Sequence, residues 1–246
     1  MVARGAGPPL PQADRLVVRP IIGVMARAPS SGGKSRLIEA LGVTDGPGLR
    51  TALLRDTLAA VASIDVGKAV LYTPPEGEAE MQRVTPFDAL FLGQRGATLG
   101  ERMRNAISDL LARGFGPVVL IGADLPTLPA AYVVEAVDRL ARRHESVVLG
   151  PSEDGGYYLI GLTRVHDELF ADMPWGTADV LRLTQQAADA LHVTIELLPR
   201  WYDVDQPADL QRVRRQSPQA ESRAHFTLAW LAALPAAPAS AESERL

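Results

Sequence analysis

The sequence of 246 residues contains no cysteine. This absence excludes structural disulfides and thiolate metal sites and is typical of a reducing compartment, so we expect a cytoplasmic protein. The sequence also lacks an apolar run of about 18 residues, which argues against stable membrane insertion. Its first twelve residues are rich in proline and glycine and lack the apolar stretch of a signal peptide.

The sequence has no excess of positive charge, since its formal net charge is −4. A weakly acidic protein has no general attraction for nucleic acid or for an anionic membrane. Any anion that it binds must therefore be held by a few local cations, by backbone N–H groups or by a metal ion. The four histidines show no metal-ligand spacing, and we assign them no role.

The chain length and the 47% content of apolar residues fit one α/β domain with tails. We expect a flexible tail over residues 1–19, a domain over residues 20–216 and an Ala/Pro-rich tail over residues 217–246. The last segment carries an apolar patch from Phe226 to Leu234, which predicts a short helix docked on the domain. A partner contact and a membrane-surface helix are the alternatives for this patch.

Apolar runs alternate with helical periodicity along the chain. Strands are expected at 21–25, 69–72, 89–92, 118–121, 147–149, 157–160 and 193–198, and helices at 49–64, 99–111, 130–140, 180–191 and from 207 onward. Continuous rather than alternating apolar strands indicate a mostly parallel sheet covered on both faces, that is, a three-layer Rossmann-like α/β fold. Ligands of such sheets bind beyond the carboxyl ends of the strands, so chemistry is expected just after residues 25, 121, 149 and 198.

A loop of small and basic residues, 28–37, follows the first expected strand. Gly32 and Gly33 let backbone N–H groups approach an anion, while Lys34 and Arg36 add positive charge and a helix begins near Ser35. This composition predicts a phosphate-binding loop. It is not a Walker A loop, because position 28 is not the required glycine. A plain surface turn is the alternative.

Acidic residues stand at two other expected strand ends. Asp124 follows the strongest strand, and Asp203 and Asp205 precede the last helix. Carboxylates at the mouth of a site suit Mg²⁺ held jointly with substrate phosphates. Alternatively, Asp124 caps a turn and Asp205 caps the helix that begins at Pro207.

A third acidic loop has the sequence Glu153-Asp154-Gly155-Gly156-Tyr157. Asp154 could bind acceptor hydroxyls, assist a metal or act as a base, and Gly155, Gly156 and Tyr157 would then line the acceptor site; a simple Asp-Gly turn is the rival interpretation. Trp175 and Thr177, which flank Gly176, are further candidates for an acceptor pocket, although loop tryptophans also serve packing.

Together these segments resemble the DUF2064 family of GT-A proteins, whose members are often labelled arsenosugar-biosynthesis glycosyltransferases or nucleotide-diphospho-sugar transferases. The resemblance spans about residues 21–215. It is carried, in order, by the loop ending KSRL, by LGERM at 99–103, IGADLP at 121–126, LGPSEDGGYYLIGL at 149–162, WGT at 175–177 and DVDQPADL at 203–210.

The resemblance implies a GT-A fold that binds a nucleotide with Mg²⁺ or Mn²⁺. By analogy with related nucleotidyltransferases, Gly32, Gly33, Lys34 and Arg36 would hold the phosphates, and Ala26 is counted among the nucleotide-binding positions. Asp124 and Asp205 would bind the metal, with Asp203 as a further candidate. The phosphate loop is one residue shorter than the usual pattern.

Two reactions fit this scaffold, and the fold does not choose between them. In the first, a nucleotidyltransferase joins an NTP to a phosphorylated or acidic small molecule and releases pyrophosphate, with Lys34 and Arg36 stabilising the leaving group. In the second, a glycosyltransferase uses an NDP-sugar and Asp154 acts as the base. The basic loop and the lone Asp124, where Asp-x-Asp is usual for glycosyltransferases, favour the first. A non-catalytic nucleotide-binding module is a further alternative, and homo-oligomerisation is left open.

Overall fold

The computed structural model describes residues 19–143, 145–216 and 224–234. Its centre is a seven-stranded sheet in the order β3-β2-β1-β4-β6-β5-β7. The strands are β1 (Arg19–Arg27), β2 (Gly67–Thr73), β3 (Leu90–Gly93), β4 (Phe115–Gly122), β5 (Val147–Pro151), β6 (Tyr157–Leu162) and β7 (Ile195–Leu197). Only β6 runs antiparallel to its neighbours β4 and β5, so the expected mostly parallel α/β sheet is confirmed.

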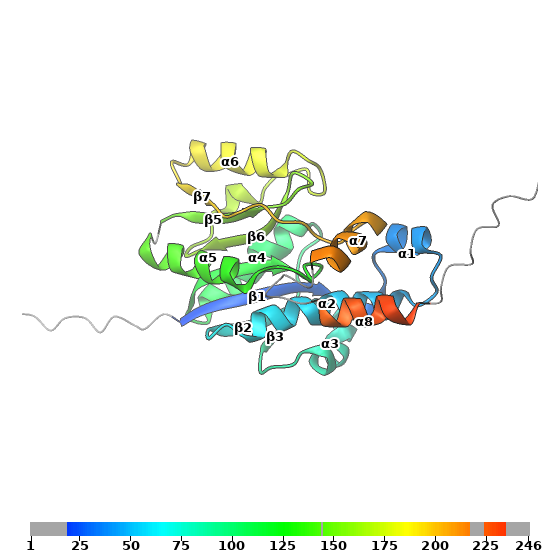
Figure 1. Ribbon diagram of the computed structural model, residues 1–246. Coiled ribbons are helices and arrows are strands. Elements are labelled where there is room, and N and C mark those ends of the chain that lie inside the picture. The colour runs from blue at the N-terminus through cyan, green and yellow to red at the C-terminus, as the bar shows by residue number, and fades with distance from the viewer. Residues whose placement is uncertain (1–18, 144, 217–223, 235–246) are drawn as a thin grey trace, which may run out of the picture.

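Helices cover both faces of this sheet (Figure 1). They are α1 (Ser35–Leu41), α2 (Gly46–Ala62), α3 (Glu78–Val84), α4 (Leu99–Ala112), α5 (Ala130–Arg142), α6 (Val180–Ala190), α7 (Pro207–Gln216) and α8 (His225–Ala233), with short 3-10 turns at Pro29–Ser31, Pro75–Gly77 and Asp167–Leu169. No helix of the described residues is long and apolar enough to cross a membrane.

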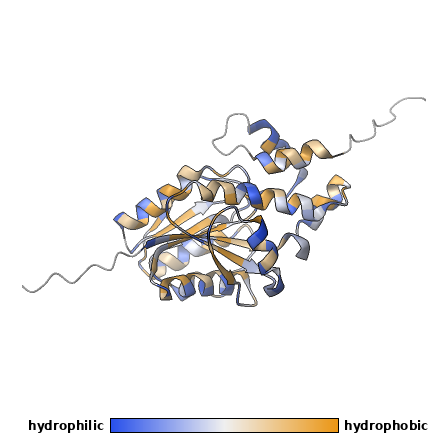
Figure 2. Cartoon of the chain, turned by 90° about the horizontal axis from the view of Figure 1, so that it is seen from below, coloured by the Kyte–Doolittle hydropathy of each residue, from blue (hydrophilic) through white to orange (hydrophobic). Residues whose placement is uncertain are grey.

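The alternation of side chains along each strand divides the core into two layers. Ile22 and Val24 of β1 pack with α2, α3 and α5 on one face, while Ile21 belongs to the layer beneath α4 and α6. Gly23 lies on the α4 face, where an added Cβ would come within 2.7 Å of Leu120 Cδ2. Figure 2 shows the apolar strands enclosed between helices whose outer faces are polar.

A third apolar cluster joins α1, α2, α7 and α8 at the end of the molecule toward which β1 points (Figure 1). The helix expected in the C-terminal segment is thus present as α8, packed on α2. Its first N–H groups are capped by the buried Asp56 of α2, which accepts from Phe226 N at 3.0 Å and from Thr227 N at 2.7 Å. The segments 1–18, 217–223 and 235–246, which hold most of the two expected tails, lie outside the described residues.

Candidate functional site

The loop after β1 has an unusual backbone conformation. Gly32 and Gly33 have φ values of 96° and 108°, and Lys34 has a φ of 54°, so the chain turns through left-handed backbone at three consecutive residues. Among the residues that the structure describes, these three N–H groups donate no hydrogen bond. Free N–H groups on a glycine-rich turn are what an anion-binding loop requires.

Two neighbouring elements hold this loop in place. Arg50 of α2 donates from Nε to Pro29 O at 2.6 Å and from Nη1 to Gly33 O at 2.9 Å. Glu80 of α3 accepts from Ser30 N at 3.0 Å and from Ser30 Oγ. Neither Arg50 nor Glu80 was among the predicted site residues, because nothing in the sequence links them to a loop that lies 17 residues before Arg50 and 50 residues before Glu80.

The side chain of Lys34 pairs with two acids from distant segments, Asp124 after β4 and Asp205 before α7. Its ammonium lies 2.9 Å from Asp124 Oδ2 and also pairs with Asp205 Oδ1. The Lys34 side chain is only 10% exposed. Burial on its own lowers the pKa of Lys34, but Asp124 and Asp205 together raise it above the ordinary lysine value, so the ammonium is fully charged.

Asp203 and Asp205 share one side of the segment before α7 because it is extended, with Tyr202 and Val204 buried on the other side. Burial, followed by the neighbouring Asp205 carboxylate, raises the pKa of Asp203 to about 7. Burial also works to raise the pKa of Asp205, but Lys34 outweighs it and leaves that pKa below its usual value. The two carboxylates therefore differ in charge near neutral pH.

The loop between β5 and β6 is a tight turn that also reaches the site. Asp154 Oδ1 accepts from Gly156 N at 3.0 Å and from Ser152 Oγ, so this carboxylate shapes the turn. Gly155 packs against Ala178, whose carbonyl oxygen would lie 2.3 Å from an added Cβ. The turn interpretation of this segment is thus correct, and Asp154 at the same time lines a cavity.

Two adjoining cavities open at this end of the sheet. The first, which we call the loop cavity, has a volume of about 320 Å³ and is lined by residues that include Arg27, Gly32, Gly33, Lys34 and Arg50. The second, the tryptophan pocket, has a volume of about 210 Å³ and is lined by residues that include Asp154, Gly156, Trp175, Thr177 and Asp203. Asp124, Leu99, Met103 and Tyr157 line both cavities.

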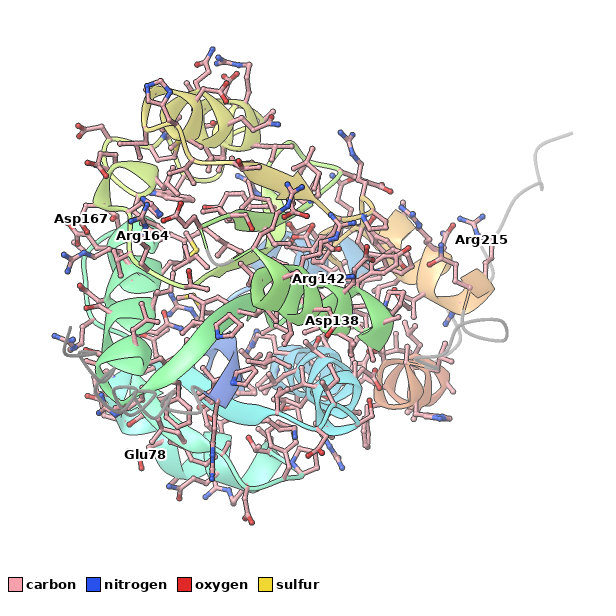
Figure 3. All side chains as sticks on the ribbon, turned by 90° about the vertical axis from the view of Figure 1, so that its left-hand side faces the viewer. Glu78, Asp138, Arg142, Arg164, Asp167 and Arg215 are labelled. Atoms are coloured by element: carbon pink, nitrogen blue, oxygen red, sulfur yellow. The ribbon has the colours of Figure 1, made fainter. Side chains whose placement is uncertain are left out.

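Trp175 is positioned by Gly100 at the start of α4. A Cβ added to Gly100 would lie 2.5 Å from Trp175 Nε1, so only glycine lets the indole pack there. The Trp175 ring meets Tyr157 edge-on, with ring centroids 6.2 Å apart. The segment before Trp175 is linked to α4 by the ion pair between Arg104 and Asp167, and Figure 3 shows Asp167 at the edge of the molecule beside Arg164.

The remaining predicted residues lie in different surroundings. Arg36 is exposed and lines a third hollow of about 700 Å³ together with Lys34, Asp124 and Asp205, outside the loop cavity and the tryptophan pocket. Ala26 is buried in the core, and its carbonyl accepts from Gln94 Nε2 at 3.2 Å. The structure therefore gives Ala26 no exposed surface for a nucleotide. In the Leu99–Met103 motif, Glu101 completes the capping box of α4, while Leu99 and Met103 face the cavities.

The carboxylates can be tested for their fit to a divalent cation. In the described ranges, no three acidic, histidine or cysteine side chains gather as a metal site. Asp124 and Asp205 nevertheless converge on a single cationic atom, the Lys34 ammonium. Two convergent carboxylates completed by substrate phosphates and water form a donor set that suits Mg²⁺, so these residues fit the ion if Lys34 moves aside.

The sequence family DUF2064, described as uncharacterised proteins conserved in bacteria, matches residues 57–177. The predicted family resemblance is confirmed. No curated protein matches the chain significantly.

Solved structures confirm the GT-A-type fold. A candidate nucleotide-diphospho-sugar transferase from Desulfovibrio desulfuricans G20 is 27% identical with a TM-score of 0.79, and the match covers 88% of this chain and 96% of that one. A CMP:2-keto-3-deoxy-manno-octonic acid synthetase in complex with CTP is 14% identical, with a TM-score of 0.54 and coverage of 82% and 99%. A cytidylyltransferase from Leptospira borgpetersenii serovar Hardjo-bovis is 11% identical, with a TM-score of 0.56 and coverage of 87% and 94%.

Proposed function

We propose that this protein is a metal-dependent transferase with a nucleotide donor, and that it transfers a nucleotidyl group from an NTP with release of pyrophosphate. The observation that carries the proposal is the convergence of Lys34, Asp124 and Asp205 beside a loop with free N–H groups. Cationic and N–H donors next to paired carboxylates are what a metal–nucleoside triphosphate requires. The fold relatives named above are a candidate nucleotide-diphospho-sugar transferase, a CMP:2-keto-3-deoxy-manno-octonic acid synthetase and a cytidylyltransferase. These relatives support a transferase with a nucleotide donor.

The donor phosphates would bind at the loop cavity. The N–H groups of Gly32, Gly33 and Lys34 face incoming phosphate oxygens, and Arg27 adds a positive charge to the same cavity. Asp124 and Asp205 would hold Mg²⁺ or Mn²⁺, which when bound neutralises charge on the phosphates. An oxygen of the acceptor attacks the α-phosphorus, the bond to the β-phosphate breaks, and pyrophosphate leaves with the electron pair. Lys34 would stabilise that leaving group, and Arg36, in the adjoining hollow lined by Lys34 and Asp205, is the second cationic candidate for this role.

Glycosyl transfer from an NDP-sugar is the second candidate. It is favoured by the position of Asp154, which uses Oδ1 for the turn and leaves its other oxygen for an acceptor hydroxyl in the tryptophan pocket. In this reaction Asp154 accepts the hydroxyl proton, the acceptor oxygen bonds to the sugar C1, and the NDP leaves. A purely nucleotide-binding role would leave this second cavity without a purpose.

The experiment that separates these reactions measures pyrophosphate release from each of the four common NTPs with Mg²⁺, alongside hydrolysis of UDP- and GDP-sugars. Lys34→Met serves as the loss-of-function variant. Lys68→Met is its matched control, because Lys68 is the other lysine of the sequence and its ammonium bonds backbone carbonyls before β2. Pyrophosphate release that needs Lys34 and not Lys68 supports nucleotidyl transfer. Sugar-nucleotide turnover without pyrophosphate would replace it by glycosyl transfer.

A further inference from the structure

The two cavities differ sharply in the charge of their walls. The loop cavity has three cationic side chains, Arg27, Lys34 and Arg50. The tryptophan pocket is lined by Asp124, Asp154 and Asp203, and among the described residues no lysine, arginine or histidine lines it. Of these two cavities, only the loop cavity has the cationic side chains that phosphates require.

The lysine and arginine side chains nearest the tryptophan pocket form ion pairs with acidic side chains. Lys34 reaches Asp124 from the loop side and pairs there with Asp205. Arg104, behind Trp175, forms an ion pair with Asp167, and its guanidinium lies in a separate depression of the surface. Arg212 donates to both oxygens of Glu153, outside the pocket. The charge of Asp124 is offset by Lys34, so an anionic group inside the pocket would meet the carboxylates of Asp154 and Asp203, with which no described lysine, arginine or histidine forms an ion pair.

We propose that the acceptor of this transferase is an uncharged molecule bearing hydroxyl groups, and not a phosphorylated or carboxylic acid. The proposal rests on the function argued above, because it takes the loop cavity as the site of the donor. It departs from the acidic acceptor expected from the sequence. Transfer to such an acceptor breaks its O–H bond, and Asp154 is the carboxylate in the pocket that can take the proton.

The walls of the pocket suit the two faces of a carbohydrate-like molecule. Trp175 and Tyr157 present aromatic surface, and Leu99, which is 47% exposed, adds an apolar edge at the mouth. Asp154 and Thr177 supply polar oxygens on the same pocket. The C–H groups of such a ligand can pack on the aromatic rings while its hydroxyl groups donate hydrogen bonds to the oxygens. Small-molecule sites commonly combine apolar walls with a few polar groups in this way.

A cationic acceptor fits less well than an uncharged one. Asp124 borders both cavities, so a divalent ion held by Asp124 and Asp205 would lie beside the pocket and repel a cation. The carboxylate of Asp154 and the proposed metal thus oppose ligands of either charge. Neutral hydroxyl compounds avoid both penalties.

The charge preference of the pocket can be measured without knowing the acceptor. The chain has three tryptophans, so a Trp201→Phe, Trp230→Phe double variant leaves Trp175 as the only indole. Its fluorescence is titrated with neutral acrylamide and with iodide at constant ionic strength. We expect the iodide quenching constant, relative to acrylamide, to be roughly threefold lower than for free N-acetyltryptophanamide, as a local negative potential of about one RT requires. Adding Asp154→Asn to the double variant should raise the iodide quenching constant.

The proposal would be overturned if the iodide quenching constant of the double variant, relative to acrylamide, equalled that of free N-acetyltryptophanamide. It would also be overturned if Asp154→Asn left this constant unchanged. A second measurement uses the unmodified protein with Mg²⁺, an NTP or NDP-sugar donor and matched acceptors, namely glycerol with glycerol 3-phosphate and glucose with glucose 6-phosphate. Adducts formed with an uncharged member and detected by mass spectrometry support the proposal. Adducts formed only with the phosphorylated members contradict it.

These outcomes are separable from failure of the proposed function. If the protein bound no metal–nucleotide, the donor assignment would fail while the Trp175 quenching result would still stand. If nucleotide binding were intact and iodide entered freely, only the acceptor class would be wrong.

Discussion

The ammonium of Lys34 lies 2.9 Å from the carboxylate of Asp124 and pairs at the same time with Asp205. One cationic atom of the protein thus occupies the space between two carboxylates that a divalent ion would need. When a metal–nucleotide binds, we expect Lys34 to leave this position and contact the phosphates. The same lysine would then neutralise the acids of the free protein and the leaving group of the complex.

This relationship predicts that Lys34→Met binds Mn²⁺ more tightly than the parent protein when no nucleotide is present. Removing the competing ammonium should lower the metal Kd roughly tenfold, which corresponds to about 1.4 kcal/mol. Electron paramagnetic resonance of free Mn²⁺ measures this directly, with Lys68→Met as the control. Weaker metal binding by Lys34→Met would show that the lysine does not compete for the metal position.

Arg50 is predicted to hold the loop in place, in addition to the positive charge that it gives the loop cavity. Arg50→Gln removes the charged donors to Pro29 O and Gly33 O, each hydrogen bond to a charged group contributing roughly 1.5–3 kcal/mol. We expect the nucleotide Kd to rise at least about tenfold and the Tm to fall by several degrees, since both hydrogen bonds also stabilise the folded loop. Arg95→Gln is the control, since Arg95 pairs with Asp109 and lines neither cavity. An unchanged nucleotide Kd would rule out this positioning role.

Gly100→Ala should impair the tryptophan pocket while leaving nucleotide binding at the loop cavity intact. The new methyl would clash with Trp175 Nε1 and, at 2.6 Å, with Phe170 O, so the wall of the tryptophan pocket must shift. We expect acceptor-dependent turnover to fall roughly tenfold or more, because small displacements of positioned groups have large effects on rate. The nucleotide Kd, measured by calorimetry, should stay within about twofold. Loss of nucleotide binding in parallel with turnover would contradict the division into two subsites.

The attachment of α8 should depend on pH through Asp56. Burial raises the pKa of this carboxyl group, although hydrogen bonds from Thr227 and Phe226 oppose the shift. Because the folded protein holds this proton more tightly than the unfolded chain, the contribution of Asp56 to stability decreases as pH rises from the ordinary aspartate pKa through the raised one. Asp56→Asn should flatten the pH dependence of the unfolding free energy in this window. An identical slope in parent and variant would exclude Asp56 as its source.

The sequence predicted the sheet well where apolar runs are continuous, as in the run Val118–Ile121 that forms half of β4. It did not predict that β6 lies antiparallel between β4 and β5, since strand pairing depends on contacts far apart in the chain. Helix α3 was missed because its seven residues begin directly after a Pro-Pro-Glu-Gly turn and carry few apolar side chains.

The candidate site was predicted as a set of residue types but not as an arrangement. Lys34, Asp124 and Asp205 were each singled out by their positions after expected strands. The sheet order explains why Lys34 meets Asp124, because β1 and β4 are neighbours. Asp205 follows the edge strand β7 and reaches the site through the segment before α7, where Val204 N donates to Asp124 O at 3.0 Å. Their direct pairing, and the separation of basic from acidic cavity walls, follow from side-chain directions that no local pattern encodes. Ala26 illustrates the reverse case, since a position at a strand end proved to be buried.

The central claim is that Asp124 holds a metal–nucleotide at the end of β4, and isothermal titration of Mg²⁺ with each NTP tests it most directly. Asp124→Ala is compared with Asp138→Ala, a control on α5 outside the lining of both cavities (Figure 3). We predict that the parent and Asp138→Ala bind an NTP only with Mg²⁺, and that Asp124→Ala loses this binding while its circular dichroism and Tm are retained. Binding of nucleotide and metal by Asp124→Ala as in the parent would contradict the proposed site.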